Sequence, residues 1–368
     1  MDLPARHIDK VHCAPYAGRM TTLTLEAVDV PRSDIQTVFS NRVTRTQPLD
    51  QFVYRSPARY TAPAIRFSAP QPLFVTGDKF TIVAERSGLV PESTYLFNEY
   101  EWRGLFARPR DIVPVTEGPT LVAGNAAWRN YSHWLFQCFS PLLLAPLAGL
   151  GEAHALVPPL NHIQREFLHH AGWPPDRYTE LPAATVALPA NGVYTNLTGG
   201  EFPFLPHPAI AKAFEMFAAR APRSVFSGQR VFLSRMDARK RVMVNEAELI
   251  ARLAAQGFAI VTPATLSAEA QVALFRDAAL LVGPHGAGFT NLLFAGGDGE
   301  GPVVVELHQD NYPASAFARL CQVKRLPYTA IFNPMVSPGA DGRHDSTWEA
   351  DIELIVDTLA GVAPAHRR

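Results

Sequence analysis

The stretch Leu280–Ala295 reads LLVGPHGAGFTNLLFA, and the fold prediction is built outward from it. Its first residues, Leu280–Gly283, are apolar and stop at Gly and Pro, which is typical of a short buried strand. Phe289–Ala295 predicts the first turns of a helix, with a tight glycine turn before it. Such a turn exposes backbone N–H groups at the positive end of a helix dipole, and this geometry binds phosphate. We therefore expect a nucleotide diphosphate to be held by Pro284, His285, Gly286, Ala287 and Gly288. The alternative is an ordinary strand-to-helix connection whose glycines only permit a sharp bend.

Strands and helices alternate on both sides of this stretch. Asn245 is the predicted N-cap of one helix, with Glu248 three residues on, and Gly257 ends that helix. Strands that alternate with helices in this way are typical of half of a doubly wound parallel sheet. The strands are expected at Arg230–Ser234, Phe258–Val261, Leu280–Gly283 and Val303–Leu307, and the other helices at Ala268–Ala279 and Phe289–Ala295.

A second alternation of the same kind begins near residue 119. Strands are expected at Leu121–Ala123, Ala155–Val157 and Thr185–Leu188. The predicted class is therefore α/β, with two Rossmann-like domains at 119–222 and 223–335. Residues 1–118 hold short β-like pieces among Pro and Arg and form an irregular β-rich segment, and residues 336–368 form a C-terminal loop and helix.

Composition limits the classes of protein that fit. The chain has 368 residues, of which 47% are hydrophobic and 18% charged, so it can bury large cores. A net charge of -1 gives no argument for nucleic-acid binding, and anion binding must come from local clusters. Three widely spaced cysteines, Cys13, Cys138 and Cys321, indicate free thiols in a reducing compartment. The first residues lack an apolar leader and no run of about 18 apolar residues occurs, so we expect a cytoplasmic protein.

A basic loop follows the predicted strand Arg230–Ser234. Ser234 and Arg235 therefore lie at the carboxyl edge of the sheet, where open α/β sheets bind their ligands. An Arg at that edge binds phosphate through two parallel hydrogen bonds, and Arg241 lies close behind it. We interpret Arg239 and Lys240, in between, as a solvated basic face.

A carboxylate and a histidine complete the candidates. Glu306 ends a very apolar strand, where it can accept ribose hydroxyls, form a buried ion pair or be an ordinary strand-end residue. His133 lies in the other half, in the run Asn130–Trp134, near a helix start. If the two halves face each other, His133 is a candidate general base, and the alternative is a hydrogen-bonded, partly buried histidine.

Several motifs are missing from the sequence. It has no Asp-x-Asp, so a metal-held diphosphate is not expected, and no G-x-x-x-x-G-K-[ST] or G-x-G-x-x-G, so the P-loop and dinucleotide patterns fail. It also lacks the G-x-S-x-G of hydrolases and the H-E-x-x-H of metalloproteases. These absences favour binding of an anion by backbone and arginine alone.

Taken together, the motifs resemble glycosyltransferase family 61 in its bacterial branch, over roughly residues 119–330. The resemblance rests on the order of Asn130-Tyr131-Ser132-His133-Trp134-Leu135, Phe232-Leu233-Ser234-Arg235, Arg241, Asn245-Glu246, Gln271, Phe275, Gly283–Gly288, Asn291, Phe294 and Val305-Glu306-Leu307.

The resemblance implies a GT-B-like fold, in which two Rossmann-like domains face a cleft, with inverting chemistry and no essential metal. Residues 223–335 would bind the nucleotide sugar, and residues 119–222, with the N-terminal segment packed on them, would face the acceptor. Carried over residue by residue, Asn130 and His133 would face the reaction centre. The donor would be bound by Ser234, Arg235, Arg241, the turn Pro284–Gly288 and Asn291, with Asn245, Glu246 and Glu306 as surrounding or ribose-binding residues.

The expected function is metal-independent, inverting transfer of a sugar from a nucleotide sugar, typically UDP-linked, to a hydroxyl of a glycan or glycoconjugate. The resemblance points to acceptors of the polysaccharide, capsule or lipopolysaccharide type. Peripheral association with the inner face of a membrane is compatible with the sequence, although no segment requires it. Gln137 departs from the family, whose bacterial members usually carry an acid there, and Ser140-Pro141 replaces a frequent Pro-Arg. The alternatives are an epimerase- or phosphorylase-like enzyme and a non-catalytic carbohydrate-binding or scaffold module of the same fold.

Overall fold

The structure is a computed structural model, and it describes residues 21–43, 49, 52, 58–86, 88–94, 110–340 and 345–362. The chain forms two compact units: residues 1–28 with 62–213, and residues 29–61 with 214–368. These units differ from the predicted domains, because residues 29–61 leave the N-terminal segment and join the C-terminal unit. Cys13 lies outside the described residues, whereas Cys138 and Cys321 are buried free thiols.

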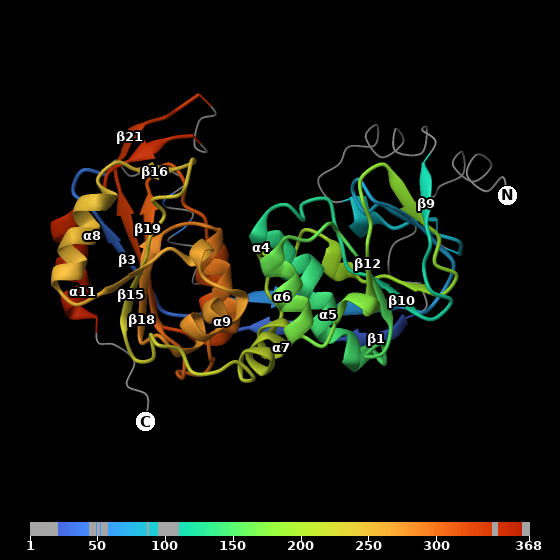
Figure 1. Cartoon of the computed structure of the whole chain (residues 1–368). Helices are drawn as coiled ribbons and strands as arrows, with labels where there is room; N and C mark the ends of the chain where they lie inside the picture. The colour runs from blue at the N-terminus through green and yellow to red at the C-terminus, as the bar shows by residue number, and fades with distance from the viewer. Residues whose placement is uncertain are drawn as a thin grey trace. The chain divides into compact units, whose positions relative to one another are not determined.

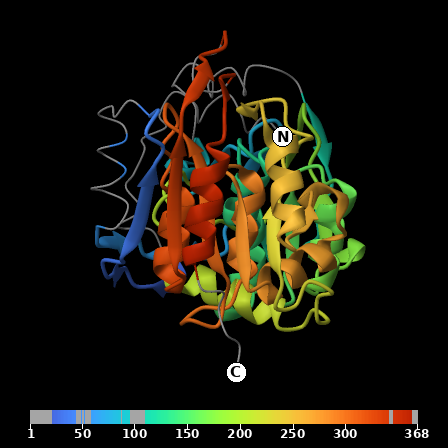
Figure 2. The ribbon, with the colours of Figure 1, turned by 90° about the vertical axis from the view of Figure 1, so that its left-hand side faces the viewer.

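The C-terminal unit is built on a six-stranded sheet in which every neighbouring pair is parallel. The strand order is β17 (Ala259–Val261), β15 (Arg230–Leu233), β18 (Leu280–Pro284), β19 (Val303–Gln309), β20 (Tyr328–Asn333) and β3 (Ile35–Phe39). β18 and β19 are buried along their whole length, as expected for a parallel sheet covered on both faces. In Figure 2 the blue strand β3 lies at the edge of this sheet, beside strands from the C-terminal part of the chain.

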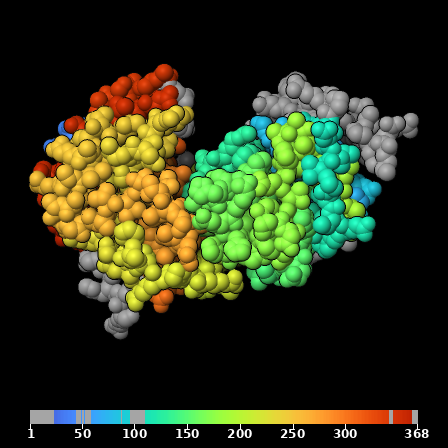
Figure 3. Space-filling model, in the orientation of Figure 1, coloured from blue at the N-terminus to red at the C-terminus, as the bar shows by residue number. Residues whose placement is uncertain are grey.

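Helices cover both faces of this sheet. Figure 1 shows α8 (Glu246–Ala255) and α11 (Ile352–Gly361) on one face and α9 (Ala268–Asp277) on the other. In the space-filling view of Figure 3, the yellow and orange part of the chain, which includes α8 and α9, forms much of the visible surface of this unit. Leucines of α8 and α11 pack on Phe232, Val282 and Val305 in one apolar core. The remaining elements are α10 (Ala316–Lys324), the 3-10 helices η6 (Pro263–Thr265) and η7 (Ala287–Phe294), and a small sheet of β16 (Val242–Met243), β22 (Thr347–Trp348) and β21 (Met335–Ser337).

The N-terminal unit has a smaller parallel sheet of its own. Its strand order is β12 (Tyr178–Glu180), β11 (His154–Val157), β10 (Thr120–Val122) and β14 (Gly192–Val193). A mixed sheet contains β8 (Gly88–Leu89), β7 (Ile82–Ala84), β6 (Leu73–Thr76), β13 (Thr185–Ala187) and β9 (Asp111–Val113), and β1 (Thr21–Leu25) pairs with β5 (Ile65–Ser68). The predicted strand at Thr185 thus pairs with strands of the N-terminal segment, because β6 lies antiparallel to it.

The helices of this unit are short. They are α4 (Tyr131–His133), the π-helix η2 (Trp134–Phe139), α5 (Ser140–Leu144) and α6 (His162–His170), with 3-10 turns η1 (Pro91–Thr94), η3 (Ala145–Ala148), η4 (Pro175–Arg177) and η5 (Asn196–Thr198). The boundaries between the units fall in β2 (Val28–Val30), its partner β4 (Tyr60–Ala62) and α7 (Pro208–Ala218). The α/β class is confirmed. Within the described residues, no helix is both long enough and apolar enough to cross a membrane.

Candidate functional site

The order of strands in the C-terminal unit creates a break in winding between β15 and β18. The chain goes from β15 outward to β17, and then returns to place β18 on the other side of β15. Open α/β sheets bind ligands at the carboxyl ends of the two strands that flank such a point. A pocket of about 280 Å³ lies there, lined by Leu233, Ser234, Arg235, Asp237, Ala238, Pro263, Ala264, Pro284, Gly286, Ala287, Gly288 and Phe289.

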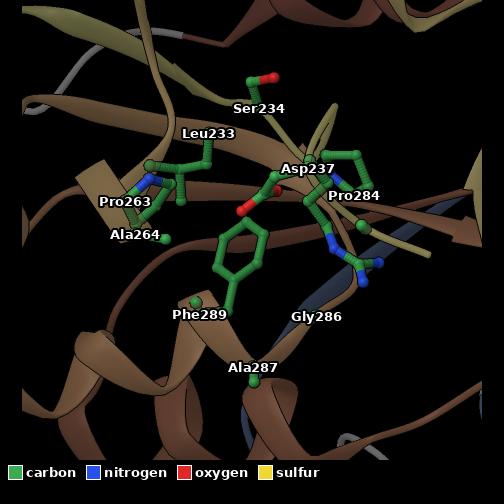
Figure 4. Close-up of a pocket in the computed structure, with 12 residues that line it drawn as sticks. Leu233, Ser234, Asp237, Pro263, Ala264, Pro284, Gly286, Ala287 and Phe289 are labelled. Carbon is green, nitrogen blue, oxygen red and sulfur yellow. The ribbon is translucent and has the colours of Figure 1, made fainter. Parts of the chain in front are cut away.

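Figure 4 shows the ring of Phe289 among the other lining residues, with Pro263 and Ala264 on one side and Pro284 on the other. Phe289 belongs to η7, which the sequence predicts as a helix start and which forms as a 3-10 helix. The pocket therefore has apolar walls, and the side chains of Arg235 and Asp237 bring both signs of charge to it.

Two glycines allow the turn after β18 to approach β15 closely. A Cβ on Gly283 would lie 2.8 Å from the backbone oxygen of Leu233, and a Cβ on Gly286 would lie 2.7 Å from Nε of Arg235. Gly286 has an extended backbone, with φ -178°, so space and not conformation requires glycine there. The glycines of the turn thus make room for the arginine.

Arg235 is fixed at both its backbone and its side chain. Its Nη1 donates to the carbonyl oxygen of His285 at 2.6 Å, and its backbone N–H donates to Oε1 of Glu246 at 2.6 Å. Ser234 Oγ donates to the same Glu246 oxygen at 2.9 Å. Burial, together with the nearby charge of Arg241, lowers the pKa of Arg235 to about 10. Glu246 is itself buried, and its carboxylate fixes the start of this loop through these two hydrogen bonds.

Arg241 brings a second, partly buried guanidinium to the same edge. It lies 4.7 Å from the centre of the Tyr312 ring, and its Nε is buried without a hydrogen-bond partner among the described residues. Its backbone is in the left-handed region at φ 53°, and its carbonyl accepts a hydrogen bond from Trp348 Nε1 at 3.0 Å. Burial lowers the pKa of Arg241 as well. Two neighbouring, partly buried cations, one with a buried and unsatisfied N–H, form a site that is complementary to an anion.

Glu306 lies beneath the turn, on the neighbouring strand β19. It is completely buried, and its Oε1 accepts a hydrogen bond from Nδ1 of His285. Its Oε2 accepts one from the Tyr328 hydroxyl at 2.5 Å, and Nε2 of His308 lies 3.3 Å from the same oxygen. Burial alone would raise the pKa of Glu306, but the interactions of its carboxylate with His308 and His285 outweigh burial and lower that pKa. Both oxygens are engaged inside the protein, so of the sequence alternatives this arrangement matches the buried partner and not the ribose contact.

His285, Glu306 and His308 are residue types that bind metals, and their potential ligand atoms lie within 4.8 Å of one another. A direct hydrogen bond joins His285 Nδ1 to Glu306 Oε1, and Nε2 of His308 lies 3.3 Å from Glu306 Oε2, whereas ligands of one metal ion contact the ion instead of each other. We interpret the cluster as a buried hydrogen-bond network. Metal independence stays a prediction.

Two more residues that the sequence predicted at the nucleotide-sugar site make hydrogen bonds to neighbouring elements of the protein. The side chain of Asn245 exchanges two hydrogen bonds with the backbone of Ala350, at 2.9 and 2.8 Å. It therefore makes no side-chain cap of α8, contrary to the sequence prediction. Asn291 is buried and donates to Gln271 at 2.9 Å, which ties η7 to α9.

His133 and Asn130 form a separate group in the N-terminal unit. Asn130 is exposed and caps α4 by accepting the backbone N–H of Ser132 at 3.0 Å. His133 Nδ1 lies 2.7 Å from Oε1 of Gln137, whose NH₂ group donates to the carbonyls of Thr198 and Gly199. Because those carbonyls only accept, the Gln137 oxygen must face the ring, and Nδ1 of His133 must carry a proton. A neutral His133 then has its lone pair on Nε2.

The comparison with known families decides the class of protein. Residues 131–299, slightly under half of the chain, match the family model described as Glycosyltransferase 61. The chain is a glycosyltransferase. The matched range of this glycosyltransferase includes His133, Arg235, Arg241 and the turn at His285, and it ends before Glu306. No curated protein matches the chain.

Some residues at the site of this glycosyltransferase were not predicted from its sequence. Tyr312 and Tyr328 reach the site through the packing of β19 and β20, and nothing local in the sequence marks them. His308 did carry a signal, because it lies two residues after Glu306 in one strand, and alternate residues of a strand share a face. Asp237, in the basic loop, provides the carboxylate of the pocket.

Proposed function

We propose that this glycosyltransferase binds the diphosphate of a nucleotide sugar at the carboxyl edge of the C-terminal sheet. The observation that carries the proposal is the pair of partly buried guanidiniums of Arg235 and Arg241, the second with a buried, unsatisfied Nε. A diphosphate supplies the negative charge and the acceptor oxygens that this pair lacks. The adjacent turn Gly286–Gly288 adds backbone N–H groups at the start of η7.

The nucleoside then occupies the pocket between β15 and β18. Its apolar walls, formed by Pro263, Ala264 and Phe289, suit the faces of a planar base. Asp237 is the carboxylate available to the ribose hydroxyls, in place of the buried Glu306. We infer a UDP-linked donor, as in the family that the sequence resembles.

The reaction follows as a single inverting displacement without a metal ion. His133, with Nδ1–H bound to Gln137, accepts the proton of the acceptor hydroxyl at Nε2. The hydroxyl oxygen attacks the anomeric carbon, and the electron pair of the breaking C–O bond leaves on the phosphate, beside the arginines. A GT-B-like fold is part of this proposal. A glycan or glycoconjugate of the capsule or lipopolysaccharide type is the acceptor, at the cytoplasmic face of a membrane.

Nucleotide binding tests the proposal without an identified acceptor. Thermal unfolding is measured with UDP, GDP, CDP and CMP, and UDP is expected to give the largest rise in midpoint, which Arg235→Ala abolishes and His133→Ala keeps. Absence of a shift with every nucleotide contradicts the donor site. Release of UDP from a donor sugar only when an acceptor is added then separates transfer from epimerisation.

A further inference from the structure

His285 has one ring nitrogen in the protein interior and one directed away from it. Nδ1 is hydrogen-bonded to the buried Glu306, so Nε2, on the far side of the ring, faces away from that carboxylate. The side chain is 13% exposed, and no described residue hydrogen-bonds Nε2. The backbone of the same residue is fixed, because Arg235 binds its carbonyl oxygen.

The ring of His285 also borders the anion site. Its centre lies 5.4 Å from that of Tyr312, and the Arg241 guanidinium lies 4.7 Å from the same Tyr312 ring. An anion bound by Arg235 and Arg241 is therefore a neighbour of His285.

The titratable and charged groups around His285 lie on or just after the strands β15, β19 and β20. Burial lowers the pKa of His285, and His308 and Arg241 act in the same direction, whereas Glu306 opposes them. Without a ligand, the ring is therefore neutral at any pH above the ordinary pKa of histidine. It then has a proton on Nδ1 and a lone pair on Nε2. The titratable or charged groups that face it are Glu306 and His308 on β19, Tyr328 on β20 behind Glu306, Tyr312 after β19, and Arg235 and Arg241 after β15.

We propose that binding of a nucleoside diphosphate draws a proton from solvent onto Nε2 of His285, so that the resulting imidazolium hydrogen-bonds the leaving phosphate. The diphosphate brings negative charge that offsets the two arginines, and Glu306 supplies a permanent negative charge behind the ring. When the bond between sugar and phosphate breaks, its electron pair stays on the phosphate oxygen, and the Nε2–H group stabilises that charge. Glu306 is the positioning residue, because it holds Nδ1–H and stays ionised throughout.

This inference rests on the proposed donor site, and proton uptake measures it directly. UDP is titrated into the intact protein by calorimetry at about pH 8, where the terminal phosphate of UDP is already ionised. Two buffers with different enthalpies of protonation, each containing EDTA, give the number of protons taken up. We expect about one proton per UDP in the wild type, and a clear loss of uptake in His285→Gln and Glu306→Gln. His170→Gln, an exposed histidine of α6, is the matched control and should keep full uptake.

Each outcome separates the inference from the proposed function. UDP binding without proton uptake in the wild type overturns the role of His285 but leaves the donor site intact, whereas no UDP binding overturns the donor site itself. Uptake that persists in His285→Gln places the proton elsewhere and also overturns the inference. UDP binding that occurs only when a divalent cation replaces EDTA contradicts the metal-independent site and also overturns the inference. If Glu306→Gln unfolds, the partly exposed His285→Gln decides alone.

Discussion

The side chain of Arg235 occupies the space that a Cβ on Gly286 would need, since that Cβ would lie 2.7 Å from Nε and 2.9 Å from Cζ of the arginine. Gly286→Ala is therefore expected to displace the guanidinium and weaken UDP binding by about 10-fold or more, because a charged hydrogen bond contributes about 1.5–3 kcal/mol. Gly361→Ala, at the end of α11, is the control, since a Cβ there would meet no atom within 4 Å. Equal UDP affinities of the two variants in a calorimetric titration would contradict this arrangement.

Arg241 is expected to lower the stability of the folded protein and to strengthen the binding of UDP. Arg241 is partly buried and its Nε has no hydrogen-bond partner among the described residues, and replacing such a desolvated charge with an apolar side chain of similar volume is often stabilising. Arg241→Met should therefore keep or raise the thermal midpoint while it weakens UDP binding by about 10- to 100-fold. Arg239→Met, at an exposed position of the same loop, should change neither quantity. A parallel loss of stability and affinity in Arg241→Met would indicate a structural role instead.

Asp237 is expected to recognise the ribose. Asp237→Ala should weaken UDP by roughly 10-fold, because a charged hydrogen bond to a hydroxyl is lost. Its affinity for 2′-deoxy-UDP should fall much less if the 2′-hydroxyl is the partner. The affinities of UDP and 2′-deoxy-UDP are measured by titration for the wild type and for Asp237→Ala. An equal loss of affinity for the two nucleotides in the variant would exclude contact between Asp237 and that hydroxyl.

Gln137 is expected to act on turnover through the orientation of His133. Gln137→Met keeps the side-chain volume but removes both the acceptor for Nδ1–H and the donor to the Thr198 and Gly199 carbonyls. The rate constant for transfer should fall by about 10- to 100-fold, since small errors in the position of a base are costly. UDP affinity should stay unchanged, and a fall in affinity together with the rate would count against a positioning role.

The N-terminal unit should lose stability in mild acid because of His207. This buried histidine accepts the backbone N–H of Ala209 at Nδ1, at 3.0 Å, and donates from Nε2 to the Glu26 carbonyl at 2.9 Å. Burial lowers its pKa from the ordinary 6.5, so its contribution is present above pH 6.5 and is lost as the pH falls through the folded value. Unfolding free energies measured between about pH 8 and 5 should fall less steeply in His207→Gln, by up to ~1.4 kcal/mol per pH unit. Identical slopes would show that another group titrates.

Local patterns were sufficient to predict the α/β class and the position of the glycine turn. The apolar run that begins at Leu280 and the spacing of the strands around it reflect burial on both faces of a parallel sheet. The position of Arg235 followed as well, because a residue directly after a parallel strand lies at its carboxyl edge.

Contacts that depend on strand order could not be predicted in the same way. Glu306 bonds to Tyr328 and His285 only because β19 lies between β20 and β18. The missing side-chain cap at Asn245 has a similar cause, since a tertiary partner, the backbone of Ala350, takes its amide. Local preference for a cap was overridden by a contact that lies 105 positions away in the sequence.

The edge strand β3 makes the order of synthesis a concern for this fold. Gln36 of β3 and Thr329 of β20 are 293 positions apart, so β3 leaves the ribosome long before β20, its hydrogen-bonded neighbour in the sheet, exists. Until then the backbone N–H and C=O groups of β3 lack their partners in the sheet. In any fragment that starts after β3, β20 becomes an open sheet edge, and such an edge can pair with other chains. Residues 214–368 expressed alone should therefore aggregate, and a β3 peptide supplied in trans should restore their solubility.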